Sequence, residues 1–401
     1  MLDVAAEDSA PVAARSEATV LRRRAAIVSA LFLILPLFVV FAQKGLVVWL
    51  ALALVAPPPL KKWPEIASWR TRNLLRIFAV LFLWCVVTLS WAPADARDHL
   101  ALVIAVTIVG GLWCVNMNTL DPIERAQIGT RAVVCLVFTL LLLTFDSITS
   151  LRLGMWFSGE TSRAQRLVEV GGVVATVALV ALVPLTLILR DELRAKQVRF
   201  PIISGALAFL LLANALYLEA FATVAALGAS AIAFLAVYWR RHAGLSLIGI
   251  LAIGYLLLAP TIHIWPSDET PEGSRADAWR AVSGEIYDNM LLGHGFASSG
   301  ALDTGESASQ GNARPHNLFL QIWYEFGLVG AVLFSLLIAT ILNDAARANV
   351  GRLENGIGAA LFAAFLVAGA MGFGLWDAGW LAGSWLACGM LGLVDDDRAG
   401  A

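Results

Sequence analysis

The chain has 401 residues, of which 59% are hydrophobic and only 14% are charged, and its mean hydropathy is +0.77. Because a soluble globular chain carries about a quarter charged residues, this composition excludes a water-soluble enzyme and indicates an integral membrane protein. The net charge of -2, without a block of basic residues, also excludes nucleic acid as the partner.

Twelve apolar segments are candidates for crossing a hydrocarbon layer about 30 Å thick as helices, in which all backbone polar groups are satisfied internally. They lie at 25–42, 45–60, 74–91, 99–116, 131–149, 169–189, 200–218, 221–239, 244–263, 317–342, 356–376 and 378–394. The sequence therefore predicts an all-α polytopic membrane protein with about twelve transmembrane helices.

Arginine and lysine set the expected orientation, since they are retained on the cytoplasmic side of short loops. With the N-terminus inside, 20 of the 28 basic residues are cytoplasmic and 8 lie outside, so both termini are expected in the cytoplasm. Residues 1–24 and 395–401 then form cytoplasmic tails, 25–263 hold spans one to nine, and 317–394 hold the last three. We expect the first span to be an uncleaved anchor, because its apolar stretch is longer than that of a signal peptide.

Two periplasmic connections differ from the short or basic loops elsewhere. The loop at 150–168 contains Arg163 and Arg166, against the positive-inside trend, and a long Gly-rich loop at 264–316 joins spans nine and ten. A guanidinium group presents donors that suit a phosphate or diphosphate. The alternative is that these arginines pair with neighbouring acidic residues or with lipid headgroups.

The long loop contains a stretch with helical character that opens at Arg275. Trp279 follows four residues later, so the two side chains share a helix face and offer a cation beside an apolar platform. The stretch ends at Gly293-His294-Gly295, where the glycines permit a sharp turn or a close approach to a ligand. His294 is either a functional group or a turn residue with a solvated imidazole.

The segment from Arg314 onward is polar and becomes a membrane helix within three residues, which puts His316 at the extracytoplasmic mouth of the tenth span. Asn317, Gln321 and Glu325 follow at intervals of four, so they form a polar stripe on one helix face. Polar side chains among lipid are costly and mark a site that faces the bundle interior. The alternative is that the histidine is structural.

These residues resemble the O-antigen ligase and polymerase (Wzy-C type) family of bacterial envelope glycosyltransferases. The resemblance rests on two motifs in order, which are Ser274-Arg275 with Trp279 leading to Leu292-Gly293-His294-Gly295-Phe296, and His316-Asn317 with Leu320-Gln321 and Glu325-Phe326-Gly327. It covers most of the chain after about residue 70, and the twelve-span topology and the long outside loop agree with it.

The resemblance implies transfer of a glycan from a polyprenyl (undecaprenyl) diphosphate carrier to a sugar hydroxyl, at the periplasmic face of the bacterial inner membrane. Ligases pass the glycan to lipid A core, and polymerases pass it to a growing O-antigen or exopolysaccharide; we favour the ligase. His316 takes the place of the family's general base, and Arg275 that of an arginine that binds the diphosphate. The expected substrate-binding residues are Arg163, Arg166, Arg314, Trp279, His294, Asn317 and Glu325.

The expected chemistry needs neither a metal nor a cofactor. A diphosphate is already a good leaving group, so arginines suffice to hold its charge, and no metal-binding acidic cluster lies in the outside loops. An imidazole is suited to deprotonate a sugar hydroxyl at ambient pH. In-line attack would invert the anomeric centre. The partners are the lipid-linked donor, the glycan acceptor and membrane lipids.

The sequence differs from the family at one motif, and one alternative function is not enzymatic. Members often carry Ser-Arg-Gly at the start of the eighth span, where this chain reads Leu218-Glu219-Ala220-Phe221-Ala222-Thr223, so a basic contact is missing or supplied elsewhere. A lipid-linked glycan flippase or transporter is the non-enzyme alternative, but it needs polar groups along a central pathway. The predicted spans are nearly free of charge, which favours a site at the membrane surface.

Overall fold

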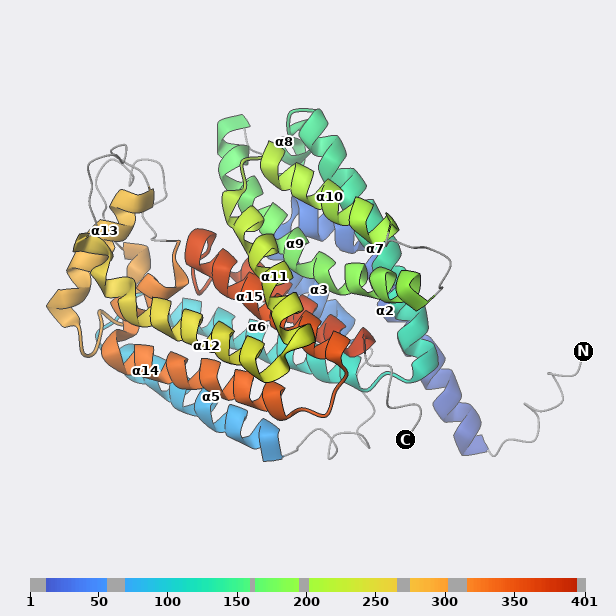
Figure 1. Ribbon diagram of the computed structural model, residues 1–401, viewed down its shortest axis with the longest axis horizontal. Helices are drawn as coiled ribbons and strands as arrows, with labels where there is room; N and C mark the ends of the chain where they lie inside the picture. Colours follow the sequence, from blue (N-terminus) through green and yellow to red (C-terminus); the bar gives the residue numbers. More distant parts are fainter. Residues whose placement is uncertain are drawn as a thin grey trace, which may run out of the picture.

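The computed structural model describes residues 12–55, 69–158, 163–194, 202–264, 275–301 and 316–394, and every regular element among them is helical (Figure 1). The α-helices are α2 (Val12–Phe41), α3 (Leu46–Ala53), α5 (Trp69–Thr88), α6 (Ala96–Asn118), α7 (Pro122–Ile148), α8 (Arg152–Ser158), α9 (Arg163–Arg194), α10 (Ile202–Tyr217), α11 (Phe221–Trp239), α12 (Arg241–Leu258), α13 (Arg275–Glu285), α14 (Leu318–Arg347), α15 (Arg352–Gly372) and α16 (Ala378–Met390). Short 3-10 helices include η1 (Gln43–Gly45), η3 (Ala259–Ile264), η4 (Ile286–Asn289), η5 (Ser298–Ala301) and η7 (Leu391–Leu393).

Each of the twelve apolar segments predicted from the sequence contains a helix. Seven helices among the described residues are long and apolar enough to cross a membrane. The remaining segments correspond to shorter apolar helices, at Ala26–Phe41, Gln43–Ala53, Asn73–Thr88, Ile202–Tyr217 and Ala378–Leu393. The predicted all-α, multi-pass membrane protein is therefore confirmed at this level, while the number of twelve spans and the side of the termini stay predictions.

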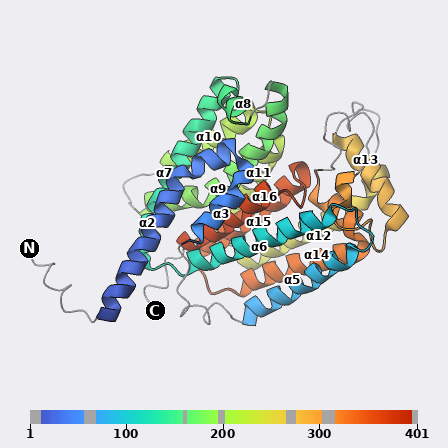
Figure 2. The ribbon, with the colours of Figure 1, turned by 180° about the vertical axis from the view of Figure 1, so that it is seen from behind.

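Helix α9 lies at the centre of the larger core. It packs against α7, α10, α15 and α16, and 72% of its most apolar window is buried inside the protein. On the other side of α15, a second core joins α5, α12 and α14, and α13 lies over the ends of α12 and α14 (Figures 1 and 2). In Figure 1, α8 lies at the top of the molecule and α13 at its left.

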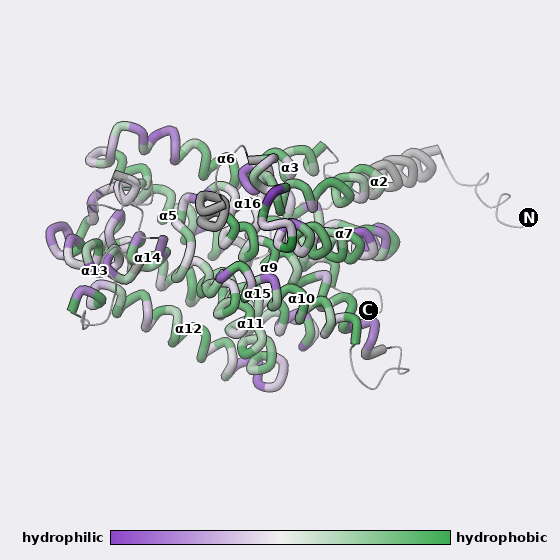
Figure 3. Tube along the Cα trace, turned by 90° about the horizontal axis from the view of Figure 1, so that it is seen from above, coloured by the Kyte–Doolittle hydropathy of each residue, from purple (hydrophilic) through white to green (hydrophobic). Residues whose placement is uncertain are grey.

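Figure 3 shows that α7, α11 and α12 consist mostly of apolar residues. Large apolar side chains are exposed on the helices, including Phe209 on α10 (72%), Ile250 on α12 (69%) and Ile232 on α11 (66%). Exposing such a side chain to water is less favourable than burying it by about 1.5–3 kcal/mol, whereas in a bilayer the side chain contacts hydrocarbon. This exposure pattern is the one expected of a helical protein surrounded by lipid.

Helix α14 is broken at Gly327, where φ is 62° and ψ is -157°. An L-residue rarely adopts this conformation, and a Cβ atom added at Gly327 would lie 2.5 Å from the carbonyl oxygen of Leu291. The tenth predicted span, 317–342, is therefore two helical segments rather than one continuous helix. The first segment, up to Phe326, is buried throughout.

The backbone groups freed at this break form hydrogen bonds with residues 290–295 of the long loop. Tyr324 O accepts from His294 N (2.8 Å), Glu325 O from Gly295 N (3.0 Å), Met290 O from Leu328 N (2.8 Å), and Leu291 O from Val329 N (3.4 Å). The indole of Trp84 in α5 donates to Phe326 O (3.4 Å). Unsatisfied backbone groups are costly away from water, so the loop's backbone replaces the missing helical hydrogen bonds.

We predict that Gly327→Ala destabilises the protein by about 2 kcal/mol or more, because the new Cβ atom meets Leu291 and the left-handed conformation is strained. Gly254→Ala in α12 is the matched control, since a Cβ atom there has no neighbour within 4 Å. Thermal unfolding of the purified protein in detergent measures both variants. Equal melting temperatures for the two would contradict the described break.

Candidate functional site

The carboxyl group of Glu325 is completely buried at the centre of a polar cluster. It accepts hydrogen bonds from Ala297 N (2.9 Å), Ser299 Oγ (2.5 Å), Gln321 Nε2 (2.8 Å) and Trp376 Nε1 (2.6 Å). Three of these partners are N–H groups that can only donate, so the carboxyl oxygens are matched to them as acceptors. We call Glu325 and these four partners the Glu325 cluster.

The Glu325 cluster joins three segments that are distant in the sequence. Ala297 and Ser299 belong to the long loop, Gln321 and Glu325 to the first segment of α14, and Trp376 to the connection between α15 and α16. The carbonyl oxygen of Gln321 also accepts from Leu375 N in that connection (2.6 Å). A buried donor that lost its acceptor would be left unpaired at a cost of about 1–3 kcal/mol, so the cluster holds these segments in one arrangement.

Asn317 is also fully buried, and it caps the start of α14. Its side-chain oxygen accepts from the backbone N–H groups of Phe319 (3.0 Å) and Leu320 (3.1 Å), and its amide nitrogen donates to the hydroxyl of Tyr255 in α12 (3.2 Å). An Asn cap of this kind stabilises a helix start by about 1 kcal/mol. All of these contacts are internal, so Asn317 fixes the helix end that carries His316.

His316 immediately precedes this cap and is half-buried. Its backbone has a φ of 41°, a left-handed value that is uncommon for a residue other than glycine. The ten residues after Asn317 are all buried, whereas His316, directly before Asn317, is partly exposed. The structure therefore places His316 directly before the buried first segment of α14, and its position at the extracytoplasmic mouth of a membrane span stays a prediction.

His294 lies in the turn that replaces the hydrogen bonds of α14. Its ring stacks on Tyr324, with centroids 4.3 Å apart and planes 14° from parallel. Nε2 is 3.2 Å from the carbonyl oxygen of Glu285, and Nδ1 is 3.4 Å from the side-chain nitrogen of Asn289. The imidazole is half-buried and holds the turn against α14, which differs from a freely solvated turn residue.

Trp279 is half-buried on α13, where it packs against the second core. Beside it, Arg280 pairs with Asp277 across one helical turn (3.0 Å). Arg275 is the first residue of α13, Arg163 is the first of α9, and Arg166 lies in the opening turn of α9. Their side chains, and Arg314 as a whole, lie outside the described residues. The positions of these four guanidinium groups stay predictions.

The predicted polar stripe is present but is covered by protein rather than by lipid. Gln321 and Glu325 bond to each other, as their spacing implies, whereas Asn317 bonds to α12 instead. The sequence analysis missed Ser299, Trp376 and Tyr255, because their neighbours come from distant parts of the chain. Gly327, which follows Glu325 and Phe326, gave no sufficient signal for the broken helix, because a glycine is tolerated inside an apolar helix.

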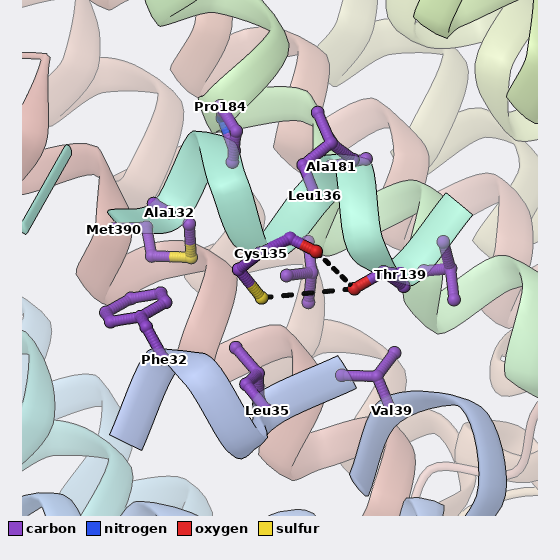
Figure 4. A pocket seen from close by; sticks show the side chains of 12 residues that line it. Phe32, Leu35, Val39, Ala132, Cys135, Leu136, Thr139, Ala181, Pro184 and Met390 are labelled. Carbon is purple, nitrogen blue, oxygen red and sulfur yellow. Dashed lines mark hydrogen bonds between the residues drawn. The ribbon is translucent and has the colours of Figure 1, made fainter. Parts of the chain in front are cut away.

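A separate apolar pocket lies between α2, α7 and α9 (Figure 4). Phe32, Leu35 and Pro184 are among the side chains that line it. Its polar side chains are Cys135 and Thr139; the hydroxyl of Thr139 donates to Cys135 O (2.7 Å) and lies 3.9 Å from Cys135 Sγ. It contains no charged side chain, so it does not suit a diphosphate. Within the described ranges, no group of three or more His, Cys, Asp or Glu residues is arranged to hold a metal ion.

The fold and this site describe a multi-pass helical membrane protein in which one loop is bonded to a broken helix. The sequence model of the family described as O-antigen ligase matches residues 206–335, the region that contains the Glu325 cluster apart from Trp376 and also contains His294 and His316. The predicted resemblance to that family is therefore confirmed.

Curated relatives carry the name of candidate polysaccharide ligases. A protein of Rickettsia conorii is 27% identical over 203 residues, which are 45% of this chain and 48% of that protein. Proteins of Rickettsia prowazekii and Rickettsia typhi are 31% and 30% identical over 132 residues, which are 30% of this chain and 32% of each. The matched part thus spans about a third to a half of these relatives.

We predict that Glu325→Ala destabilises the protein by about 3 kcal/mol or more, because three buried N–H donors lose their acceptor. Glu325→Gln keeps one acceptor oxygen and should fall between Glu325→Ala and the wild type. Asp98→Ala, an exposed carboxyl in the first turn of α6, is the control and should cost less than about 1 kcal/mol. Thermal unfolding in detergent ranks the variants, and equal losses for Glu325→Ala and Asp98→Ala would refute the cluster's role.

Proposed function

We propose that the protein is an O-antigen ligase-like glycosyltransferase that moves a glycan from a polyprenyl diphosphate carrier to a sugar hydroxyl of lipid A core. The observation that carries this proposal is the position of His316, at the exposed end of a buried, capped helical segment inside the region that matches the O-antigen ligase family. The names of the Rickettsia relatives, which are those of candidate polysaccharide ligases, support the transfer of a polysaccharide to an acceptor.

In this proposal His316 is the general base. Its imidazole takes the proton from the acceptor hydroxyl, the oxygen attacks the anomeric carbon, and the bond from that carbon to the carrier diphosphate breaks. The carrier diphosphate leaves from the opposite face, so the anomeric configuration inverts. Positioning favours such a step because an imidazole fixed at a rigid helix end loses little freedom in the transition state.

The arginines are proposed to hold the diphosphate. Arg275 opens α13, whose later turns pack against α14, and Arg163 and Arg166 open α9. The starts of both helices belong to predicted periplasmic connections, where the headgroup of a lipid carrier is found. Guanidinium groups stabilise the charge that develops on the leaving diphosphate. Arg314, two residues before His316, is proposed to bind the same charge.

Trp279 and His294 are proposed to contact the glycan, since aromatic surfaces suit the apolar faces of sugar rings. Asn317 and Glu325 are buried and bonded internally, so we assign them to positioning His316 and the loop. The proposed active site faces the periplasm at the surface of the inner membrane. A flippase pathway gains no support from Glu325, because its carboxyl is enclosed by four hydrogen-bond partners.

The test compares a strain lacking the gene with strains complemented by the wild type, by His316→Ala and by His263→Ala. His263 is the matched control, an exposed histidine at the end of η3 that precedes the same loop. Electrophoresis of lipopolysaccharide and of carrier-linked glycan is the measurement. We expect the deletion and His316→Ala strains to lose every O-antigen band and keep polymer on the carrier, and we expect His263→Ala to restore the bands.

Other profiles identify other reactions. A single repeat left on the core would indicate a polymerase with the same chemistry, and unchanged lipopolysaccharide with a lost exopolysaccharide would move the reaction to another polymer. Wild-type profiles for every polymer in the deletion strain would contradict the proposal.

A further inference from the structure

Three consecutive apolar side chains are exposed in the long loop, directly after η4. Met290 is 39% exposed, Leu291 65% and Leu292 52%. Full burial of such side chains is worth about 1.5–3 kcal/mol each, so a water-facing loop gains nothing from displaying them. Contiguous exposed apolar side chains mark a surface that contacts another apolar partner. We call residues 290–292 the apolar turn.

The apolar turn is fixed beside the break in α14. Met290 O accepts from Leu328 N (2.8 Å), and Leu291 O accepts from Val329 N (3.4 Å). Leu328 and Val329 are the first residues after Gly327, so these bonds hold the turn at the beginning of the second segment of α14. The apolar turn therefore lies beside Leu328, at the opposite end of the first segment of α14 from His316.

The second segment of α14 is apolar from Leu328 to Leu342 and ends in a polar turn that contains Asn343, Asp344 and Arg347. Its apolar part is about 22 Å long at about 1.5 Å per residue, which is most of the roughly 30 Å of the hydrocarbon layer. Leu328, Val332 and Leu336 lie on one face at intervals of four and are 37%, 48% and 51% exposed. This stripe is an exposed apolar face of the kind that contacts lipid, and it begins at Leu328, beside the apolar turn.

We infer that the apolar turn inserts into the outer leaflet and contacts the acyl chains of bilayer lipids. Its exposed side chains continue the lipid-facing stripe of α14 at the level where that stripe begins. Trp91 supports this depth, because its indole is 39% exposed and donates to Gly293 O (3.2 Å) directly after the turn. Indole rings favour the boundary between headgroups and hydrocarbon.

This anchor does not depend on the proposed reaction. It sets the depth of the loop in the membrane through backbone hydrogen bonds to α14 and through the acyl chains around Leu291 and Leu292. The first segment of α14, from Leu318 to Phe326, is enclosed by protein. The polar side chains of the Glu325 cluster therefore do not meet lipid at any depth.

A fluorescent label attached to a cysteine at Leu291 tests the inference. The four native cysteines, Cys85, Cys114, Cys135 and Cys388, are first replaced by alanine. The full chain with Leu291→Cys is then reconstituted into phosphatidylcholine vesicles with or without bromine on the acyl chains near the headgroup. Gly284→Cys on α13 is the matched control, because this glycine is exposed and a Cβ atom there has no neighbour within 4 Å.

We expect brominated lipid to quench most of the fluorescence at Leu291, with dissolved iodide having little effect, and the reverse result at Gly284. Quenching at Leu291 by iodide alone would overturn the inference. Disulfide crosslinking between two Leu291→Cys chains, without bromine quenching, would show that a second copy covers the turn and would also overturn it. If the cysteine-free chain does not fold, a fluorescent amino acid placed directly at position 291 gives the same readout in the native-cysteine chain.

Discussion

The buried carboxyl group of Glu325 is the interaction on which the arrangement around it depends. Its four hydrogen bonds join Ala297 and Ser299 of the long loop, the first segment of α14 and the connection between α15 and α16. A carboxyl group enclosed in this way is stable only while every donor is in place, since an unpaired buried polar group costs several kcal/mol. The break at Gly327 depends on the same loop, because the loop that contacts Glu325 also forms hydrogen bonds with the backbone groups freed at the break.

This constraint separates the residues that hold the site from those proposed to act in it. Asn317 and Glu325 have their polar groups occupied inside the protein, whereas His316 stands at the outer end of the segment that they fix. A rigid support for a reacting imidazole is valuable because a small displacement of a catalytic group lowers the rate sharply. The proposed transfer therefore relies on a positioned histidine, with arginines at the starts of α9 and α13 holding the diphosphate.

Local and periodic features of this chain were predictable from its sequence. The apolar segments, the helix that starts near Arg275 and the contact between Gln321 and Glu325 follow from composition and from helical spacing. The break at Gly327 was not predicted, because a glycine is tolerated inside an apolar helix and only the loop beside it requires the left-handed conformation. Trp376 and Tyr255 were missed for a related reason. Their partners, Glu325 and Asn317, lie 51 and 62 residues away, and no short-range pattern reports such contacts.

The most direct test of the account is the transfer rate of purified protein in lipid vesicles that contain a polyprenyl diphosphate-linked glycan and lipid A core. We expect His316→Ala to melt at the wild-type temperature and to lose transfer by about 100-fold or more, as expected for removal of a general base. Transfer by His316→Ala at the wild-type rate, with the same melting temperature, would contradict the assignment of His316 as the base.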